Sequence, residues 1–268
     1  MKLTAIVTGA SEGLGKSFAF ELASRAINLV LVALPNSGLP QLANFIRINF
    51  NIEVTEFELD LTQTENCETI FNTLQQQRIT ADFLINNAGL GNWSWFEEKQ
   101  IDFYKKQIDL NITSTVLLTR LFLDQINKQQ PSYILNVGSL GGRFVVPRKL
   151  VYGATKSFIS YFTRCLQLEQ VNSLVKVSLL SPGGINTKPE LLVLNHALKG
   201  ISKATILEPE QVAKKAIDGL LKGKKEIIPG QINRLLVFFD LLLPNFIKAL
   251  IIKRKLTATV GTPRLVNA

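Results

Sequence analysis

The sequence predicts an α/β protein built on one doubly wound parallel sheet with helices on both faces. Apolar, β-branched runs alternate with segments long enough for crossover helices. The runs are apolar almost throughout, which is typical of strands covered on both faces, and right-handed crossovers then wind the sheet in both directions. A chain of 268 residues with 46% apolar content is large enough to bury a full-sized core in one domain.

The predicted strands place the chemically notable residues at one edge of the sheet. The strands are expected at residues 3–8, 29–33, 53–57, 82–86, 133–137, 175–180 and 226–229. Gly9, Asp60, Ala88, Ser139 and Pro182 follow the first, third, fourth, fifth and sixth of them. Because ligands bind at the carboxyl ends of such strands, this edge is the expected site.

The first strand runs into a glycine-rich turn and then a helix. Gly9, Gly13 and Gly15 punctuate the turn, and Phe18 and Leu22 continue with helical spacing. Glycines allow a tight turn and close backbone approach, while the free N–H groups and positive dipole end of the helix attract an anion such as a pyrophosphate. The alternative is an ordinary turn between a strand and a helix.

Tyr152 and Lys156 are four residues apart in a segment expected to be helical, so they lie one turn apart on one face. A nearby cation favours the phenolate, and we therefore expect Lys156 to lower the pKa of Tyr152. The same spacing also occurs on many solvated helices, where it carries no chemistry.

Further motifs occur in a recognisable order. Asn86-Asn87-Ala88-Gly89 follows the glycine turn, and Asn111, Ser139 and Pro182-Gly183 come later. Over about residues 1–230 this arrangement resembles the short-chain dehydrogenase/reductase family, whose members are Rossmann-fold oxidoreductases dependent on NAD(P).

The resemblance implies a role for each motif. The catalytic residues would be Asn111, Ser139, Tyr152 and Lys156. Tyr152 would transfer the proton, Ser139 would align the substrate oxygen, Lys156 would hold the nicotinamide ribose, and Asn111 would hold a water in a proton relay. The cofactor would contact Gly9, Ser11, Glu12, Gly13, Leu14, Gly15, Asp60, Leu61, Asn87, Ala88, Gly89, Tyr152, Lys156, Pro182, Gly183, Ile185 and Thr187.

The choice between NADP and NAD depends on the end of the second strand. A carboxylate there is typical of NAD enzymes and a basic residue of NADP enzymes. This chain has Ala33 and Leu34 at those positions and Glu12 in the glycine turn. Because no carboxylate at the end of this strand repels a phosphate, and Asn36, Ser37 or Lys16 are candidates to contact it, the sequence favours NADP, with NAD as the alternative.

Composition limits the other functions. The formal charge of +9 is spread along the chain without a nucleic-acid-reading motif, so we expect no nucleic-acid partner. Cys67 and Cys165 are isolated and lack metal-ligand spacing, which indicates reduced packing residues and no metal. The N-terminal apolar run is too short for a signal peptide, so a cytoplasmic protein is expected.

Substrate recognition is expected from a lid at residues 188–207 within a catalytic unit of residues 1–230. The lid is strongly apolar, which favours an apolar carbonyl or secondary alcohol as substrate, although apolar residues also pack a lid without any ligand. Trp93, Trp95 and Phe96 are expected either in an aromatic wall or in the core. His196, the only histidine, is assigned no role.

Residues 231–268 form an apolar and basic extension. Within residues 234–256 neither apolar block reaches the length of a membrane span. The segment either packs on the same domain, which we prefer, or lies on a membrane surface, as similar tails suggest in lipid-related ketoreductases of the family. The family also suggests a homo-oligomer, a dimer or tetramer. The alternative to an enzyme is a cofactor-binding regulatory or peripheral membrane protein with little turnover.

Overall fold

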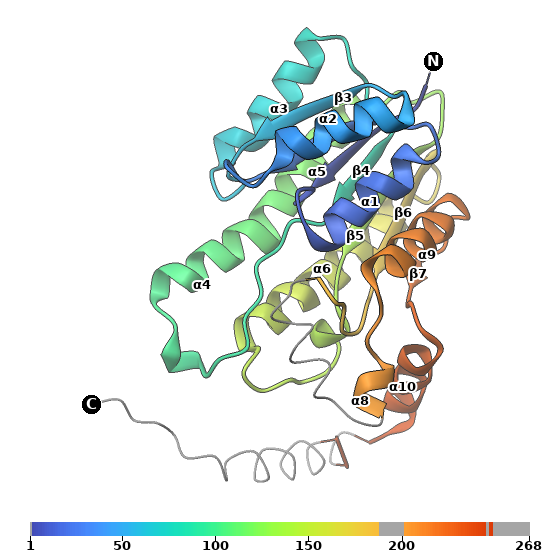
Figure 1. The fold of residues 1–268 in the computed structure, drawn as a ribbon. Coiled ribbons are helices and arrows are strands. Elements are labelled where there is room, and N and C mark those ends of the chain that lie inside the picture. Colours follow the sequence, from blue (N-terminus) through green and yellow to red (C-terminus); the bar gives the residue numbers. More distant parts are fainter. Residues whose placement is uncertain (1, 188–200, 245–246, 249–268) are drawn as a thin grey trace.

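The computed structural model describes residues 2–187, 201–244 and 247–248. Its centre is a sheet of seven parallel strands in the order β3-β2-β1-β4-β5-β6-β7 (Figure 1). The strands are β1 (Thr4–Thr8), β2 (Asn28–Ala33), β3 (Val54–Glu58), β4 (Phe83–Asn86), β5 (Ser132–Val137), β6 (Val175–Leu180) and β7 (Glu226–Ile227). The doubly wound parallel sheet predicted from the sequence is confirmed, although β7 is shorter than the predicted 226–229.

The strand order reverses between β1 and β4. From β1 the chain moves outward through β2 to β3, then crosses back to β4 and continues to β7 on the other side. Such a reversal opens a crevice at the carboxyl ends of the two central strands, because the connections leave in opposite directions. The glycine turn after β1 and the segment after β4 therefore face each other across this crevice.

Helices cover both faces of the sheet. The helices are α1 (Gly13–Ala23), α2 (Leu39–Phe50), α3 (Thr64–Gln76), α4 (Ile101–Ile108), α5 (Ser114–Gln125), α6 (Leu150–Glu169), α8 (Ile201–Ala204), α9 (Pro209–Leu221) and α10 (Gln231–Leu242). Ala5 and Val7 of β1 pack in one core with residues of α1, α2 and α9. Ile6 between them packs in the second core with α3, α5 and α6. This alternation of side chains along β1 is the two-residue period of a strand buried on both faces.

Residues 101–125 form one helical segment with a single interruption. A π-helical turn, Asp109–Thr113, separates α4 from α5 and has Asn111 at its centre. Single π turns inside α-helices frequently occur at functional sites. Here the turn redirects Asn111, whose side chain is buried, toward the carboxyl end of β4.

The C-terminal helix exposes most of its apolar side chains. Leu235, Phe238, Phe239, Leu241 and Leu242 of α10 are more than half exposed, whereas Val237 is buried. No helix within the described ranges is long and apolar enough to cross a membrane. Most of the predicted lid, residues 188–200 with His196, and most of the tail beyond 244 lie outside the described residues.

Both cysteines are free thiols. Cys67 is fully buried on α3, and burial raises the pKa of its thiol to about 11. Cys165 on α6 is half-buried. The pKa of Cys67 keeps its thiol protonated at neutral pH, in agreement with its interpretation as a packing residue.

Candidate active site

The glycine turn between β1 and α1 depends on its three glycines. Gly9 and Gly13 have φ angles of +64° and +52°, in the left-handed region that favours glycine. A Cβ on Gly15 would lie 1.9 Å from the Gly9 carbonyl oxygen, so the helix begins in direct contact with the end of the strand. No side-chain hydrogen bond from the N-cap residue closes the amino end of α1. Its first N–H groups therefore suit an anion.

The segment after β4 is hydrogen-bonded to the start of this turn through Asn87 and Ala88. The Thr8 hydroxyl accepts hydrogen bonds from the N–H groups of Asn87 and Ala88 at 3.0 and 2.9 Å. The Asn87 side-chain amide donates to the carbonyls of Thr8 and Gly9 at 2.8 and 3.3 Å. Asn87 thus connects the segment after β4 to the end of β1 and to the first residue of the glycine turn.

A cavity of about 640 Å³ occupies the crevice. The predicted cofactor residues that line it are Gly9, Ser11, Glu12, Gly13, Leu14, Gly15, Asp60, Leu61, Asn87, Ala88, Gly89 and Thr187. Its other lining residues are Ala33, Leu34, Ser37, Leu59, Thr62, Leu90, Lys106 and Leu110. Five of these, Leu59, Thr62, Leu90, Lys106 and Leu110, were missed from the sequence. Four of the five are sequence neighbours of a predicted site residue, and this neighbourhood could have indicated them.

The cavity fits a dinucleotide. Its volume falls within the range of ordinary ligand sites, and it is lined by apolar side chains with a few polar groups. The Ser37 hydroxyl on its wall is buried and has no hydrogen-bond partner within the structure. A buried polar group without a partner costs free energy, and a polar ligand group bound there would relieve that cost.

The sequence predicted no carboxylate at the end of β2, but the structure places one close to it. Ala33 and Leu34 line the cavity without a charge. A carboxylate nevertheless reaches this region from the neighbouring strand, because Glu58 pairs in register with Ala33 and its Oε1 accepts from the Asn36 N–H at 3.0 Å. Glu58 does not line the cavity. The Lys16 ammonium lies over the Phe20 ring and does not line it either.

Lys156 lies at the inner end of the site. It is only 5% exposed, and its Nζ donates to the Val137 carbonyl at 2.7 Å. Burial lowers the pKa of Lys156 to about 8. A Cβ on Gly89 would lie 3.5 Å from this Nζ and 3.3 Å from the Asn111 Oδ1. The glycine therefore lets the segment after β4 approach both side chains.

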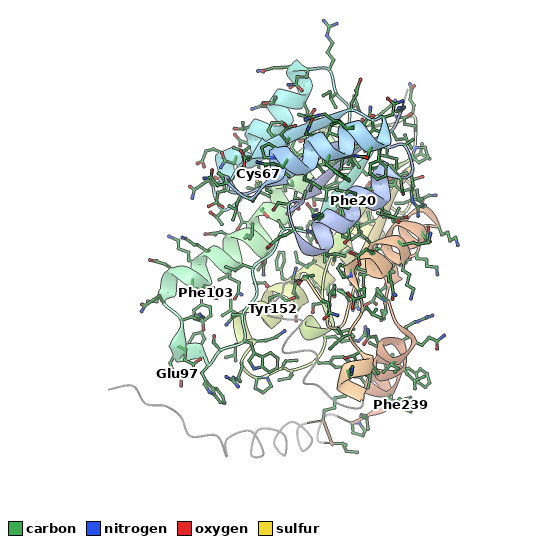
Figure 2. All side chains as sticks on the ribbon, in the orientation of Figure 1. Phe20, Cys67, Glu97, Phe103, Tyr152 and Phe239 are labelled. Atoms are coloured by element: carbon green, nitrogen blue, oxygen red, sulfur yellow. The ribbon has the colours of Figure 1, made fainter. Side chains whose placement is uncertain are left out.

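Tyr152 lies one turn before Lys156 on α6, near the middle of the molecule (Figure 2). The Lys156 Nζ is 5.9 Å from the centre of its ring. Burial raises the pKa of Tyr152, and a hydrogen bond with the Ser139 side chain partly opposes that effect. The expectation that Lys156 lowers the pKa of Tyr152 is thus not met in this structure, because burial dominates and the hydroxyl of Ser139 is the group that opposes it.

Ser139 ends the segment that follows β5. It is the N-cap of a 3₁₀ turn, Leu140–Gly142, and its Oγ accepts from the Gly141 N–H at 3.0 Å. The next residue, Leu140, donates its N–H to the Pro182 carbonyl at 2.9 Å. The predicted segment after β6 is therefore attached directly to the Ser139 turn.

Asn111 joins two elements of the site. Its Nδ2 donates to the Leu90 carbonyl and to the Thr155 hydroxyl, each at 3.0 Å, and its Oδ1 accepts from the Leu90 N–H at 2.8 Å. Thr155 lies between Tyr152 and Lys156 on α6. The structure thus brings Asn111, Ser139, Tyr152 and Lys156 into one region.

The segment after β6 contacts the site only in part. Thr187 lines the cavity, and a Cβ on Gly13 would lie 2.9 Å from the Thr187 Cβ. Ile185 forms a parallel bridge with Leu207. Gly183 packs against Asn233 of α10. Pro182, Gly183 and Ile185 do not line the cavity, and neither do Tyr152 and Lys156.

Neither tryptophan is buried in the core, and a cation lies over each ring. Trp93 is 60% exposed. The Lys149 ammonium lies 5.2 Å from the centre of the Trp93 ring, and the Arg148 guanidinium lies 5.3 Å from that of Trp95. Core packing is therefore not observed for either tryptophan. The aromatic wall stays a prediction, because Trp93, Trp95 and Phe96 do not line the cavity. The two cations over the rings were not predicted from the sequence.

Comparisons with known proteins agree with this geometry. The model of the family described as short chain dehydrogenase matches residues 3–191. The very-long-chain 3-oxoacyl-CoA reductase of Mus musculus is 32% identical over 219 residues, which are 80% of this chain and 67% of that protein. The NADP-dependent 3-hydroxy acid dehydrogenase of Schizosaccharomyces pombe is 28% identical over 84% of this chain and 89% of its own. A short-chain dehydrogenase from Sphingobium yanoikuyae in complex with NADPH superposes with a TM-score of 0.77 at 25% identity, covering 99% of this chain and 98% of that one.

Proposed function

Since the chain belongs to the short chain dehydrogenase family, we propose that it is an NADPH-dependent reductase of an apolar carbonyl compound, or the corresponding alcohol dehydrogenase in the reverse direction. The observation that carries this proposal is the meeting of Tyr152, Lys156, Ser139 and Asn111 beside a cavity that fits a dinucleotide. The cofactor, when bound, supplies the hydride, and the protein supplies the proton and the geometry.

Tyr152 is the proposed proton donor. Because burial raises its pKa, the phenol stays protonated at neutral pH, as a general acid for carbonyl reduction must. Ser139 is connected to Tyr152 by a hydrogen bond and is proposed to hold the substrate oxygen at the same point. The two hydroxyls would then orient the carbonyl before the proton moves.

Lys156 is proposed to hold the nicotinamide ribose. Its Nζ carries one hydrogen bond, to Val137, so two of its three protons are left for a ligand. Asn111 has both side-chain atoms engaged with Leu90 and Thr155. We therefore assign Asn111 the role of a positioning residue that fixes α6 against the segment after β4, and its role in a water relay stays a prediction.

NADP is the proposed cofactor, with NAD as the alternative. The S. pombe relative is named as NADP-dependent and the Sphingobium relative was solved with NADPH. In this chain the uncharged Ala33 and Leu34 leave the cavity wall without a carboxylate at the end of β2, and the Ser37 hydroxyl there lacks a partner. A 2′-phosphate oxygen is a suitable acceptor for that hydroxyl.

The substrate is proposed to be apolar around its carbonyl. The names of the mouse and S. pombe relatives support an acyl chain oxidised at its third carbon. We propose residues 1–230 as the catalytic unit, with residues 231–268 packed on it, and a homo-oligomer formed through the helices of Asn111 and Tyr152. Exposed Leu168 on α6 supports such a contact. Membrane contact through residues 234–256 stays a prediction.

A substrate panel with two tyrosine variants tests this function. Purified protein is assayed with 3-oxoacyl esters, ketosteroids and aromatic ketones while consumption of NADPH and NADH is followed separately. Wild type is expected to prefer NADPH, and Tyr152→Phe is expected to lose at least about 100-fold in kcat while cofactor affinity stays unchanged. Tyr161→Phe, an exposed tyrosine on the same helix, is the matched control and is expected to retain activity. Equal turnover by Tyr152→Phe and wild type would exclude the proposed role.

A further inference from the structure

Lys149 occupies an unusual place beside the proposed proton donor. It is the N-cap residue of α6 and is half-buried. Its Nζ lies 5.3 Å from the centre of the Tyr152 ring and 5.2 Å from that of Trp93, so the ammonium is held between two aromatic rings. Such contacts stabilise a cation only modestly and do not replace the carboxylate that a partly buried ammonium favours as a partner.

Arg148 adds a second cation at the same point. Its guanidinium lies over Trp95, and its Nε is buried without a hydrogen-bond partner. Its backbone has a φ of +70°, which costs a non-glycine residue about 1 kcal/mol. A hydrogen bond from the Ser94 N–H to the Arg148 carbonyl, 3.1 Å long, holds this conformation. The strained backbone turns two successive cations toward neighbouring aromatic residues.

Neither cation meets a carboxylate among the residues that the structure describes, although other cations of this part of the chain do. Arg143 and Arg164, for example, both pair with Glu226. Burial lowers the pKa of Lys149, as expected of an ammonium without a nearby anion. A ligand that carries an anionic group would supply the absent partner.

The position of Lys149 limits where that anion lies on the ligand. An extended chain advances roughly 1.2 Å per bond, so an anion that contacts the ammonium lies about two to five bonds from a carbonyl held by Tyr152. A carboxylate on the carbon chain of the substrate satisfies this limit. The phosphates of a long thioester carrier lie much farther from the carbonyl and do not.

We propose that Lys149, assisted by Arg148, binds a carboxylate of the substrate, so that the enzyme acts on free oxo or hydroxy acids with an apolar tail. This proposal rests on the proposed function, because it places the carboxylate relative to the carbonyl held by Tyr152. It makes Lys149 a specificity-determining residue of that reaction. The aromatic rings of Trp93 and Tyr152 lie on either side of the ammonium and orient it.

A matched set of substrates tests this proposal. Oxidation of 3-hydroxydodecanoate, its methyl ester and its coenzyme A thioester is measured with NADP⁺ for wild type, Lys149→Met and Lys149→Arg. Loss of a charge-assisted hydrogen bond is expected to reduce kcat/KM for the free acid by about 10- to 100-fold in Lys149→Met, while the ester changes little. Lys149→Arg is expected to restore most of the loss.

The control is Lys176→Met. The Lys176 ammonium also lies over an aromatic ring, 5.5 Å from the centre of that of Tyr133, and not over the ring of Tyr152. This variant is expected to treat all three substrates as wild type does. An equal loss for acid and ester in Lys149→Met would overturn the proposal, since it would mean that Lys149 acts on Tyr152 and not on a carboxylate. A loss confined to the thioester would overturn it as well, in favour of a distant phosphate.

Binding without turnover separates this proposal from the proposed function. The affinities of decanoate and decanamide for the protein with NADP⁺ are measured by calorimetry. Decanoate is expected to bind at least about 10-fold more tightly than decanamide to wild type, and no more tightly to Lys149→Met. Equal affinities in wild type would overturn the carboxylate site even if the enzyme reduces other carbonyls. A preference for decanoate would support the site even if none of the tested carbonyls is reduced.

Discussion

Asn111 forms hydrogen bonds with both backbone groups of Leu90. Its Oδ1 accepts from the Leu90 N–H at 2.8 Å, and its Nδ2 donates to the Leu90 carbonyl at 3.0 Å. A side-chain amide thus completes the backbone hydrogen bonds of a segment that no strand pairs with. The π-helical turn of residues 109–113 gives Asn111 the orientation that this arrangement requires.

Asn111→Ala is therefore expected to lower the free energy of unfolding by about 2–4 kcal/mol, because the half-buried backbone groups of Leu90 and the buried Thr155 hydroxyl lose their partners. Urea unfolding measures the change. Asn127→Ala, at an exposed asparagine whose side chain accepts only from the Gln129 N–H, is expected to cost about 1 kcal/mol or less. Similar losses in the two variants would contradict a special role of Asn111 in fixing the site.

The buried ammonium of Lys156 is expected to weaken the folded state at neutral pH. Its pKa falls from 10.5 to about 8, so between these values the unfolded chain binds a proton that the folded chain does not, and stability from this group rises with pH across that window. Below pH 8 the charged, buried ammonium destabilises the folded state by the full amount, about 3 kcal/mol. Lys156→Met removes this destabilisation but also loses the hydrogen bond to Val137, which costs about 1–2 kcal/mol.

Lys156→Met is thus predicted to be more stable than wild type by about 1–2 kcal/mol at neutral pH, despite losing activity. Urea unfolding of the two proteins without cofactor at pH ~7 and ~9.5 measures this difference. The advantage of the variant is expected to shrink or reverse at the higher pH, where the folded lysine is neutral. A variant that is less stable than wild type by the same amount at both pH values would contradict the burial cost.

The same pKa predicts the pH dependence of cofactor capture. If the charged Lys156 binds the ribose, kcat/KM for NADPH falls tenfold per pH unit above about 8, because this quantity reports ionisations of the free enzyme. Steady-state rates at limiting NADPH and saturating substrate measure it. Lys156→Arg keeps its charge at high pH, so any activity that it retains is expected to show no such decline. A wild-type profile that stays flat to pH ~10 would exclude a required charge on Lys156.

The sheet and the glycine turn of the site could be predicted from the sequence, because the patterns that indicate them involve residues close together in the chain. Alternation of apolar runs predicted the sheet, and the glycines after the first strand predicted a turn that Gly15 in fact closes against the Gly9 carbonyl. Each of these features is determined by residues close together in the chain.

Features that depend on distant contacts were not predictable in this way. Burial of Tyr152 by other segments reverses the expected direction of its pKa shift. The carboxylate of Glu58 reaches the end of β2 from the neighbouring strand, where the residues of β2 itself gave no sign of it. Lys149 looked like one of many scattered basic residues until the structure placed Trp93 and Tyr152 beside it.

Two glycines of the turn, Gly13 and Gly15, and Gly223 after α9 as a control offer a graded test of the structure, because the space around them differs. Gly15→Ala puts a Cβ 1.9 Å from a backbone carbonyl that cannot move without opening β1, and is expected to cost more than about 3 kcal/mol of unfolding free energy. Gly13→Ala meets the Thr187 side chain at 2.9 Å and keeps a positive φ, so a smaller loss is expected, together with weaker binding of NADPH. Gly223→Ala also has a positive φ, but its nearest neighbour is a flexible lysine carbon at 3.7 Å, and a loss of about 1 kcal/mol is expected from the backbone alone.

Urea unfolding and NADPH titration of all three variants measure this order. A Gly15→Ala protein as stable as Gly223→Ala would mean that α1 does not begin against the end of β1, and the anion site proposed there would lose its structural basis.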